Sequence, residues 1–401
     1  MFRCFCLFPG RASGFRMPPK LECPRSRGLG QAGARRNGSV CEQTLRAEKE
    51  SRYLKENPAL LEALGGETGC KRLSSEFYAR VGGDPVLRPL FPGKSLRCAT
   101  EEFAAFLVQF LGGSEEHTQS RWWLSLRESH ARFEIGSAER RAWLTHMAET
   151  LDAISLGEAT RKDLKRFFDH GSAYIAGQET GHEAGRSEQG ELATRWKEQL
   201  FLDAAIAAIA AGRSGEAIEI ASRFVSRPSV FVGLLARMAG SGDASMVDFV
   251  VETVEREPLL ARHRFAGRAL LHFASGAGCT PVVKSLLRLG VDPDIQQRGG
   301  HTPLYCVANE CASESGPEVV RTLVQAGADV NACGGVMHAT PLHMAARRGF
   351  VEIAKALLDC GAAIDAHDRK GDTPLQRAIK CRKAAVVQLL VDLGAARMAR
   401  A

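Results

Sequence analysis

Three polar side chains in the N-terminal half of the chain could together bind a metal centre and a small polar ligand. His130 carries an imidazole, which in its neutral form is a common metal ligand. Tyr78 and Trp143 carry a phenol O–H and an indole N–H, and both groups can donate hydrogen bonds. Because a lone histidine on an apolar helix face is more often an ordinary core residue, the surrounding sequence has to decide between the two interpretations.

The elements that must position these side chains are amphipathic helices. Between residues 52 and 176 the apolar residues recur with helical spacing, Gly and Pro interrupt the pattern, and β-type alternation is almost absent. We predict helices near residues 67–82, 97–111, 123–132, 138–154 and 158–176. Five patterns lie along them in this order: Phe77-Tyr78, Asp84-Pro85-x-Leu87-x-Pro89-Leu90-Phe91-Pro92, Phe103 to Gly112-Gly113, Leu126-x-x-x-His130-x-x-Phe133 and Ala142-Trp143-Leu144-x-x-Met147.

In this order and at these intervals, the patterns resemble a truncated globin of group II over roughly residues 62–176. The resemblance implies a two-over-two helical sandwich around one haem b, with His130 as the proximal ligand of the iron. It makes Tyr78 the distal hydroxyl, Trp143 the distal indole and Phe91 the aromatic ring that stacks on the porphyrin. A neutral imidazole leaves the sixth coordination position open, so dioxygen, nitric oxide or carbon monoxide could bind there.

Three further positions shape the haem pocket that this resemblance implies. Ala99 falls where larger globins usually keep a distal histidine, and its small side chain would leave an entrance for the ligand. Phe103 and Phe133 would form apolar walls, although the group more often has a smaller aliphatic or polar residue at the position of Phe103. The pair Trp122-Trp123 stands where the family more often shows Gly-His, which could reshape the loop before the proximal helix.

Beyond residue 200 the chain repeats itself at a nearly constant interval, which is typical of stacked repeats. The sequence that starts at Thr340 returns at Thr373, and an earlier copy begins at Thr302, with a short polar insert before the next. In each copy Thr can cap a helix, the following Pro fits the first turn, and Leu and Ala point inward. The pattern resembles the ankyrin repeat, clearly over residues 267–397 and in degenerate form over 200–266.

The remaining histidines are weaker candidates for a metal site. His117 and His170 fall in a loop and near a helix end, and His146 faces away from His130 on helical spacing, so we expect all three to be solvated. Three others belong to the repeats, where we expect the imidazole to bond to neighbouring backbone: His272, His301 and His343.

The sequence thus predicts an all-α protein, a truncated globin followed by an ankyrin-repeat α-solenoid. The basic segment at the N-terminus reads as disordered, with a transit peptide or an over-extended gene model starting near Met17 as alternatives. The predicted parts are a disordered basic tail (1–50), a haem-binding globin domain (51–177), a polar linker (178–199), degenerate repeats (200–266) and ankyrin repeats (267–397).

Charge and composition argue against several functions. The chain has 53 basic and 46 acidic side chains, but residues 1–40 hold eight of the former and one of the latter. The rest of the chain carries equal numbers of basic and acidic side chains and lacks the excess of positive charge typical of a nucleic-acid binder. No apolar run reaches the roughly 18 residues of a membrane span, so a cytoplasmic protein is expected. The 12 cysteines show no C-x-x-C zinc spacing and are expected to be buried fillers.

The predicted function is a haem protein that binds dioxygen or another diatomic gas, with repeats that dock onto an unidentified protein. A haem peroxidase or nitric oxide dioxygenase is an alternative, in which Tyr78 and Trp143 stabilise developing charge. A haem-free interaction scaffold is a third possibility. Haem retention is favoured because a buried, unpaired phenol costs about 1–3 kcal/mol unless it has a partner. The chain shows no reductase or flavin-binding pattern, which favours gas binding over a dedicated enzyme.

Overall fold

The computed structural model describes residues 59–91, 93, 95–111, 113, 125–131, 133–177 and 191–395. The predicted tail and residues 178–190 of the predicted linker lie outside this range. The described residues are predominantly helical, which confirms the all-α fold class. Their two paired strands, β1 (Arg264–Phe265) and β2 (Arg268–Ala269), form a short antiparallel hairpin. Within the described part of the chain, no helix combines the length and the apolar character needed to cross a membrane.

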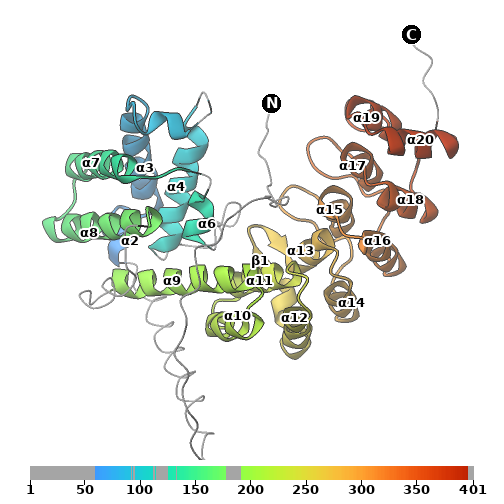
Figure 1. Ribbon diagram of the computed structural model, residues 1–401, viewed down its shortest axis with the longest axis horizontal. Helices are drawn as coiled ribbons and strands as arrows, with labels where there is room; N and C mark the ends of the chain where they lie inside the picture. Colours follow the sequence, from blue (N-terminus) through green and yellow to red (C-terminus); the bar gives the residue numbers. More distant parts are fainter. Residues whose placement is uncertain are drawn as a thin grey trace, which may run out of the picture. The chain divides into compact units, whose positions relative to one another are not determined.

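The N-terminal helices form a separate hydrophobic core. Helix α3 packs against α4 and α7, and α7 packs against α8, so two pairs of helices lie one on the other (Figure 1). On α3 the buried residues Cys70, Leu73, Phe77 and Val81 recur every three or four positions, which places them on one face. The elements are α2 (Ala59–Ala63), α3 (Gly66–Val81), η1 (Arg88–Leu90), α4 (Arg97–Phe110), α6 (Leu126–His130), α7 (Ser137–Ala153) and α8 (Glu158–Ile175).

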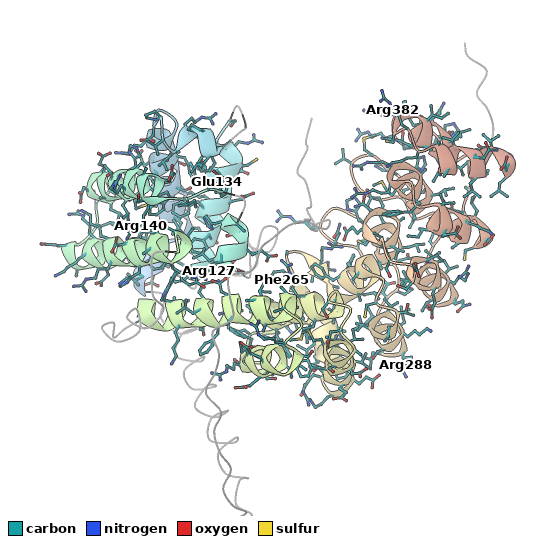
Figure 2. All side chains as sticks on the ribbon, viewed as in Figure 1. Arg127, Glu134, Arg140, Phe265, Arg288 and Arg382 are labelled. Atoms are coloured by element: carbon teal, nitrogen blue, oxygen red, sulfur yellow. The ribbon has the colours of Figure 1, made fainter. Side chains whose placement is uncertain are left out.

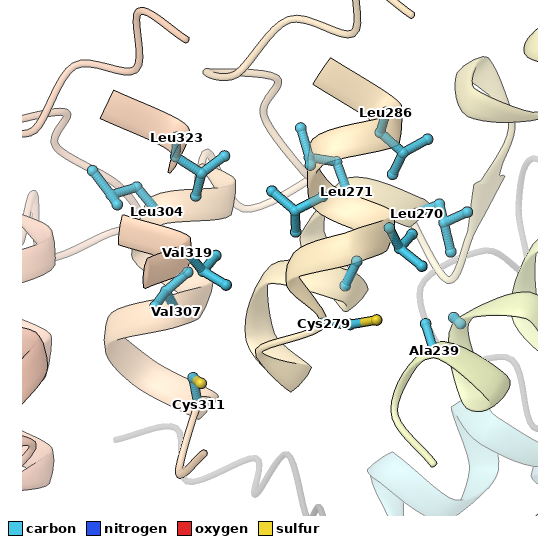
Figure 3. Close-up of a cluster of buried hydrophobic side chains, with 14 of the residues drawn as sticks. Ala239, Leu270, Leu271, Cys279, Leu286, Leu304, Val307, Cys311, Val319 and Leu323 are labelled. Carbon is cyan, nitrogen blue, oxygen red and sulfur yellow. The ribbon is translucent and has the colours of Figure 1, made fainter. Parts of the chain in front are cut away.

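The C-terminal region is an array of helix pairs stacked in succession. The first helices of neighbouring pairs contact each other, as do the second helices, and Figure 1 shows this order from α11 to α20. Buried leucines and valines of adjacent pairs, such as Leu271, Leu304 and Leu323, form a continuous core (Figure 3). The elements are α9 (Glu191–Ala210), α10 (Ser214–Ala221), η2 (Ser222–Phe224), α11 (Pro228–Ala239), α12 (Ala244–Arg256), η3 (Pro258–Arg262), α13 (Leu270–Ala277), α14 (Thr280–Arg288), α15 (Pro303–Glu310), α16 (Gly316–Gln325), α17 (Pro341–Arg348), α18 (Val351–Asp359), α19 (Pro374–Lys380) and α20 (Ala384–Asp392).

The repeat motif starts the first helices as predicted. The hydroxyl oxygens of Thr302, Thr340 and Thr373 each accept a hydrogen bond from the backbone N–H three residues later, and a proline follows each threonine. This satisfies an N–H that would otherwise have no helical partner. Gly349 ends α17 with φ 85°, a left-handed conformation that glycine adopts at low cost.

Two of the three repeat histidines hold neighbouring repeats together. The Nε2 atoms of His272 and His343 bond to the backbone carbonyls of His301 and Asp372, at 3.1 and 2.9 Å, as predicted. His301 differs, because its ring stacks on Tyr305 and its Nδ1 bonds to the side chain of Gln297 instead of backbone.

Helix α9 begins at Glu191, inside the range 178–199 that the sequence predicted as a linker. The polar, Gly-rich run ends just before this residue, so the helix begins earlier than the predicted end of the linker. Trp196 packs against the rings of Phe167 and Tyr174 on α8, at centroid distances of 6.1 and 5.4 Å. The same helix therefore contributes side chains both to the N-terminal core and, nearer its end, to the core of the array.

The described cysteines are buried or exposed, apart from Cys360, which is half-buried. Four are buried apolar fillers as predicted, and burial raises the pKa of one of them, Cys70, to about 12. Cys279 and Cys311 lie within the core of the array (Figure 3). For Cys98, Cys333 and Cys381 the prediction is wrong: these residues are exposed, because they occupy a first helical turn, a loop and a helix end.

Candidate functional site

His130 is the last residue of α6, a short helix whose start is fixed by Ser125. The Ser125 Oγ accepts a hydrogen bond from the Glu128 N–H at 3.0 Å. The His130 Nδ1 lies 2.8 Å from the carbonyl oxygen of Leu126 and 2.9 Å from the Oγ of Ser129. Because a carbonyl can only accept, Nδ1 carries the proton, and the neutral ring has its lone pair on Nε2. This is the tautomer that a metal ligand bound through Nε2 requires.

A series of ring contacts joins His130 to five of the six other predicted site residues. Side chains from α3, α4, α6 and α7, and from the residues that follow η1 and α6, contribute to it, so segments far apart in sequence meet at one place. Neighbouring centroids in the series are separated by distances typical of aromatic pairs. It runs from His130 to Phe133 (6.3 Å), Phe91 (5.9 Å), Tyr78 (5.6 Å), Phe103 (6.2 Å) and Trp143 (6.4 Å).

The rings of this series form the rim of the N-terminal core, which we call the aromatic rim. Phe77, which contacts both Tyr78 and Trp143, is buried beneath them, whereas all the rings of the series are only half-buried. Half-exposed aromatic rings next to an imidazole suit a flat, apolar, metal-containing group such as haem, which would cover them. Ala99, the remaining predicted residue, is half-buried in the first turn of α4 and has no ring with which to join the series.

Tyr78 is poised as a hydrogen-bond donor. Burial, and to a smaller extent the charge of Glu102, raises the pKa of the Tyr78 phenol, so the hydroxyl keeps its proton at neutral pH. None of the described residues forms a hydrogen bond with this hydroxyl, and the same is true of the Trp143 indole N–H. Both donors can therefore serve a ligand without first breaking a bond within the described part of the protein.

The position of His146 differs from the expected solvated histidine. Its Nε2 lies 2.8 Å from Asp84 Oδ2, and only 19% of its side chain is exposed. The other carboxylate oxygen of Asp84 accepts hydrogen bonds from the backbone N–H groups of Val86 and Leu87. The pair therefore ties α7 to the loop that carries Phe91. No sequence pattern signalled it, since 62 residues separate the partners.

We expect the contribution of Asp84 to stability to disappear in acid. The hydrogen bond from His146, followed by that from the Leu87 N–H, lowers the pKa of Asp84. Stability from a depressed pKa is complete above the unfolded value of about 3.9 and is lost as the pH falls through the folded value. Asp84→Asn should therefore lower the thermal midpoint at neutral pH, and the difference from the parent should shrink below about pH 4. Circular dichroism melts across this range check it, and a constant difference would contradict it.

Comparison with known proteins assigns both regions. Residues 59–172 match the family model described as bacterial-like globin, and residues 235–333 and 309–400 match the model for ankyrin repeats. The N-terminal part is 34% identical over 103 residues to "Group 2 truncated hemoglobin YjbI" of Bacillus subtilis, covering 26% of this chain and 76% of that protein. Globin membership indicates haem-based gas binding, and ankyrin repeats indicate protein interaction.

The relatives of the repeat region are matched over a smaller share of their length. "Ankyrin repeat and SOCS box protein 16" of Homo sapiens is 31% identical over 140 residues, which is 33% of this chain and 30% of that protein. "Ankyrin repeat and SOCS box protein 11" of Danio rerio is 40% identical over 105 residues, or 26% of this chain and 34% of that protein. On the strength of the YjbI match, this chain belongs to the bacterial-like, truncated globins, and it carries ankyrin repeats in its C-terminal region.

Proposed function

We propose that the globin domain binds haem b through His130 and holds a diatomic gas, while the ankyrin array docks the protein onto a partner. The observation that carries the proposal is the hydrogen bond between His130 Nδ1 and the Leu126 carbonyl, because it orients the ring and fixes the tautomer in which Nε2 is the metal-binding nitrogen. A haem iron held by one histidine supplies an open coordination position for dioxygen, nitric oxide or carbon monoxide. The chain contains no C-x-x-C-H attachment sequence, which favours non-covalent haem b.

The aromatic rim would hold the porphyrin and keep water away from it. Phe91 is the ring proposed to stack on the porphyrin, and its contacts with Tyr78 and Phe133 keep it in place. Phe103 and Phe133 provide apolar walls. The small side chain of Ala99 leaves room for a diatomic ligand to enter. Excluding water strengthens each hydrogen bond that the protein donates to the ligand.

Tyr78 and Trp143 are the proposed donors to the ligand. Both lie on the same rim and contact Phe103, so a ligand beside that ring is within their reach. A hydrogen bond donated by Tyr78 or Trp143 would stabilise dioxygen more than carbon monoxide, because dioxygen would carry more charge as a haem ligand. The two donors thus favour ligands that become polar on binding.

Figure 2 draws the side chains of the described residues on the ribbon. Spectroscopy of the full chain titrated with hemin tests this function. We expect one haem per chain and a Soret band that shifts on reduction and again on addition of carbon monoxide. In Tyr78→Phe, dioxygen should dissociate about 5–150-fold faster, as expected for a lost hydrogen bond of about 1–3 kcal/mol, and carbon monoxide should change less. Stopped-flow absorbance measures both rates. Haem that binds without stoichiometry would refute the proposed function, and equal effects on the two gases would refute the role of Tyr78.

A further inference from the structure

Four basic side chains gather on the last two described repeats. Arg347 and Arg348 end helix α17, and Arg369 and Lys370 lie in the loop between α18 and α19; all four residues are exposed. We call these four residues the basic strip. Arg348 bonds to the amide oxygen of Asn309 and Arg369 to the carbonyl oxygen of Val336, so their bonds are to neutral groups and leave the charges uncompensated.

The carboxylates closest in sequence to the strip are already paired with other cations. The side chain of Asp368 is fully buried and is bound by Arg377, and that of Asp372, 11% exposed, is bound by Lys380 at 2.5 Å. The negative charges of Asp368 and Asp372 are therefore neutralised by the positive charges of Arg377 and Lys380. No described carboxylate forms an ion pair with a member of the basic strip. Four positive charges therefore remain on this surface.

The repeat geometry brings the helix end and the loop together. Lys380 occupies the position on its first helix that Arg347 occupies one repeat earlier, and α17 packs directly against α19. Lys380, the last residue of α19, binds Asp372 in the loop that also carries Arg369 and Lys370. A lysine side chain at the end of a first helix is therefore long enough to reach this loop. The helix end and the loop thus belong to adjoining parts of the last two described repeats.

An exposed apolar side chain adjoins the strip. Val336 is 79% exposed, more than any other large apolar side chain in the described residues. The backbone N–H of Arg369 donates to the Met337 carbonyl at 2.8 Å, and its guanidinium reaches the Val336 carbonyl, so the two loops lie side by side. Exposed aliphatic surface beside unpaired positive charge suits a peptide that alternates acidic and apolar side chains.

We propose that the basic strip and Val336 bind an acidic segment of a partner protein, with its carboxylates on Arg347, Arg348, Arg369 and Lys370 and an aliphatic side chain on Val336. This rests on the docking role proposed for the array and specifies where and to what it docks. A nucleic acid is a poorer occupant, because Val336 offers nothing to a phosphate backbone and the charge of the sequence beyond residue 40 is balanced.

Fluorescence anisotropy with the hemin-loaded full chain tests the proposal. The probe is a fluorescein-labelled peptide of four Glu-Glu-Leu units, with a Gln-Gln-Leu peptide of equal length and a short oligothymidine for comparison. We expect the glutamate peptide to bind best and to weaken as salt increases. In Arg347→Glu/Lys370→Glu its Kd should rise at least about tenfold, since two attractive charges become repulsive.

A matched variant distinguishes the effect of the basic strip from the effect of overall net charge. Arg321 and Lys355 are exposed on the second helices α16 and α18, and Arg321→Glu/Lys355→Glu makes the same change in net charge. It should leave the Kd within about twofold of the parent. The neutralising variant Arg347→Gln/Lys370→Gln should fall between the two, and it keeps the test decisive if charge reversal disturbs folding. Circular dichroism reports the fold of each variant.

Four results would overturn the proposal. The first two are that the glutamate peptide does not bind, or that the charge-reversed and matched variants bind it with equal Kd. The other two are that the glutamine peptide or the oligothymidine binds as tightly as the glutamate peptide. The Soret band is recorded in the same samples. Lost peptide binding with an unchanged Soret band would leave the haem function standing, whereas lost haem with retained peptide binding would refute the haem function and leave the docking surface standing.

Discussion

His130→Ala is expected to weaken haem retention by more than about 100-fold, since changes to groups that merely support a metal ligand already cost about 10–100-fold. The Soret band should collapse when hemin-loaded protein passes through a desalting column. The reason is that no other described imidazole takes part in the ring contacts of the aromatic rim, so none of the described histidines is placed to replace the lost ligand. Haem transfer to apomyoglobin measures the dissociation rate.

Two controls make this result specific to His130. His170→Ala removes a half-buried imidazole from α8 of the same domain and should keep the haem. In His130→Gly, free imidazole in the buffer should restore a Soret band, because it can occupy the space of the deleted side chain. If His130→Ala keeps its haem, or if imidazole restores nothing, His130 is not the axial ligand.

Glu310→Ala is expected to destabilise the ankyrin array by about 3–5 kcal/mol, the usual cost of removing one partner from a buried ion pair. The carboxylate of Glu310 is 10% exposed and accepts a hydrogen bond from Arg268, which is 15% exposed, at 2.9 Å. Within the described part of the chain, the guanidinium then keeps the thiol of Cys306 and the face of Phe273. Urea unfolding followed by circular dichroism gives the change in free energy.

The double variant Arg268→Met/Glu310→Met shows whether charge is the cause. Removing both ions leaves no unpaired charge, and such replacements are often neutral or stabilising by about 1–4 kcal/mol. We expect the double variant to unfold at a higher urea concentration than Glu310→Ala. If the two variants are equally unstable, packing rather than the unpaired guanidinium accounts for the loss. The haem spectrum should stay unchanged in both, because both residues belong to the array.

The features that could be predicted from sequence are those that depend on the spacing of residues close together in the chain. The regular repeat and the Thr-Pro-Leu starts at 302, 340 and 373 define the capped helices that the structure contains. The Leu126 to Phe133 pattern placed His130 one turn after a carbonyl that could accept its Nδ1–H, because residues four apart face each other on a helix. A regular period or a helical turn is visible in one segment of chain.

The features that were missed depend on partners far apart in sequence. Asp84 and His146 lie 62 residues apart, and Arg268 and Glu310 lie 42 apart. Nothing in either segment specifies the other, since each pair forms only when separately folded helices or loops pack together. Trp196 is a similar case, because its ring contacts Phe167 and Tyr174 on α8. The sequence between α8 and Trp196 shows no regular apolar spacing, so Trp196 was predicted to lie in a linker.

The division of the thiols has a practical consequence for bioconjugation. Exposed Cys333 lies three residues before Val336 of the surface proposed for docking, and exposed Cys381 caps the end of a first helix, α19. Burial keeps Cys279 and Cys311 protonated by raising their pKa values, and a thiol has to ionise before it reacts with an alkylating reagent. With half-buried Cys360, exposed Cys98 and Cys381, and the cysteines outside the described residues replaced, a maleimide dye or photocrosslinker would attach to Cys333, close to Val336 in sequence, and could covalently capture whatever binds there.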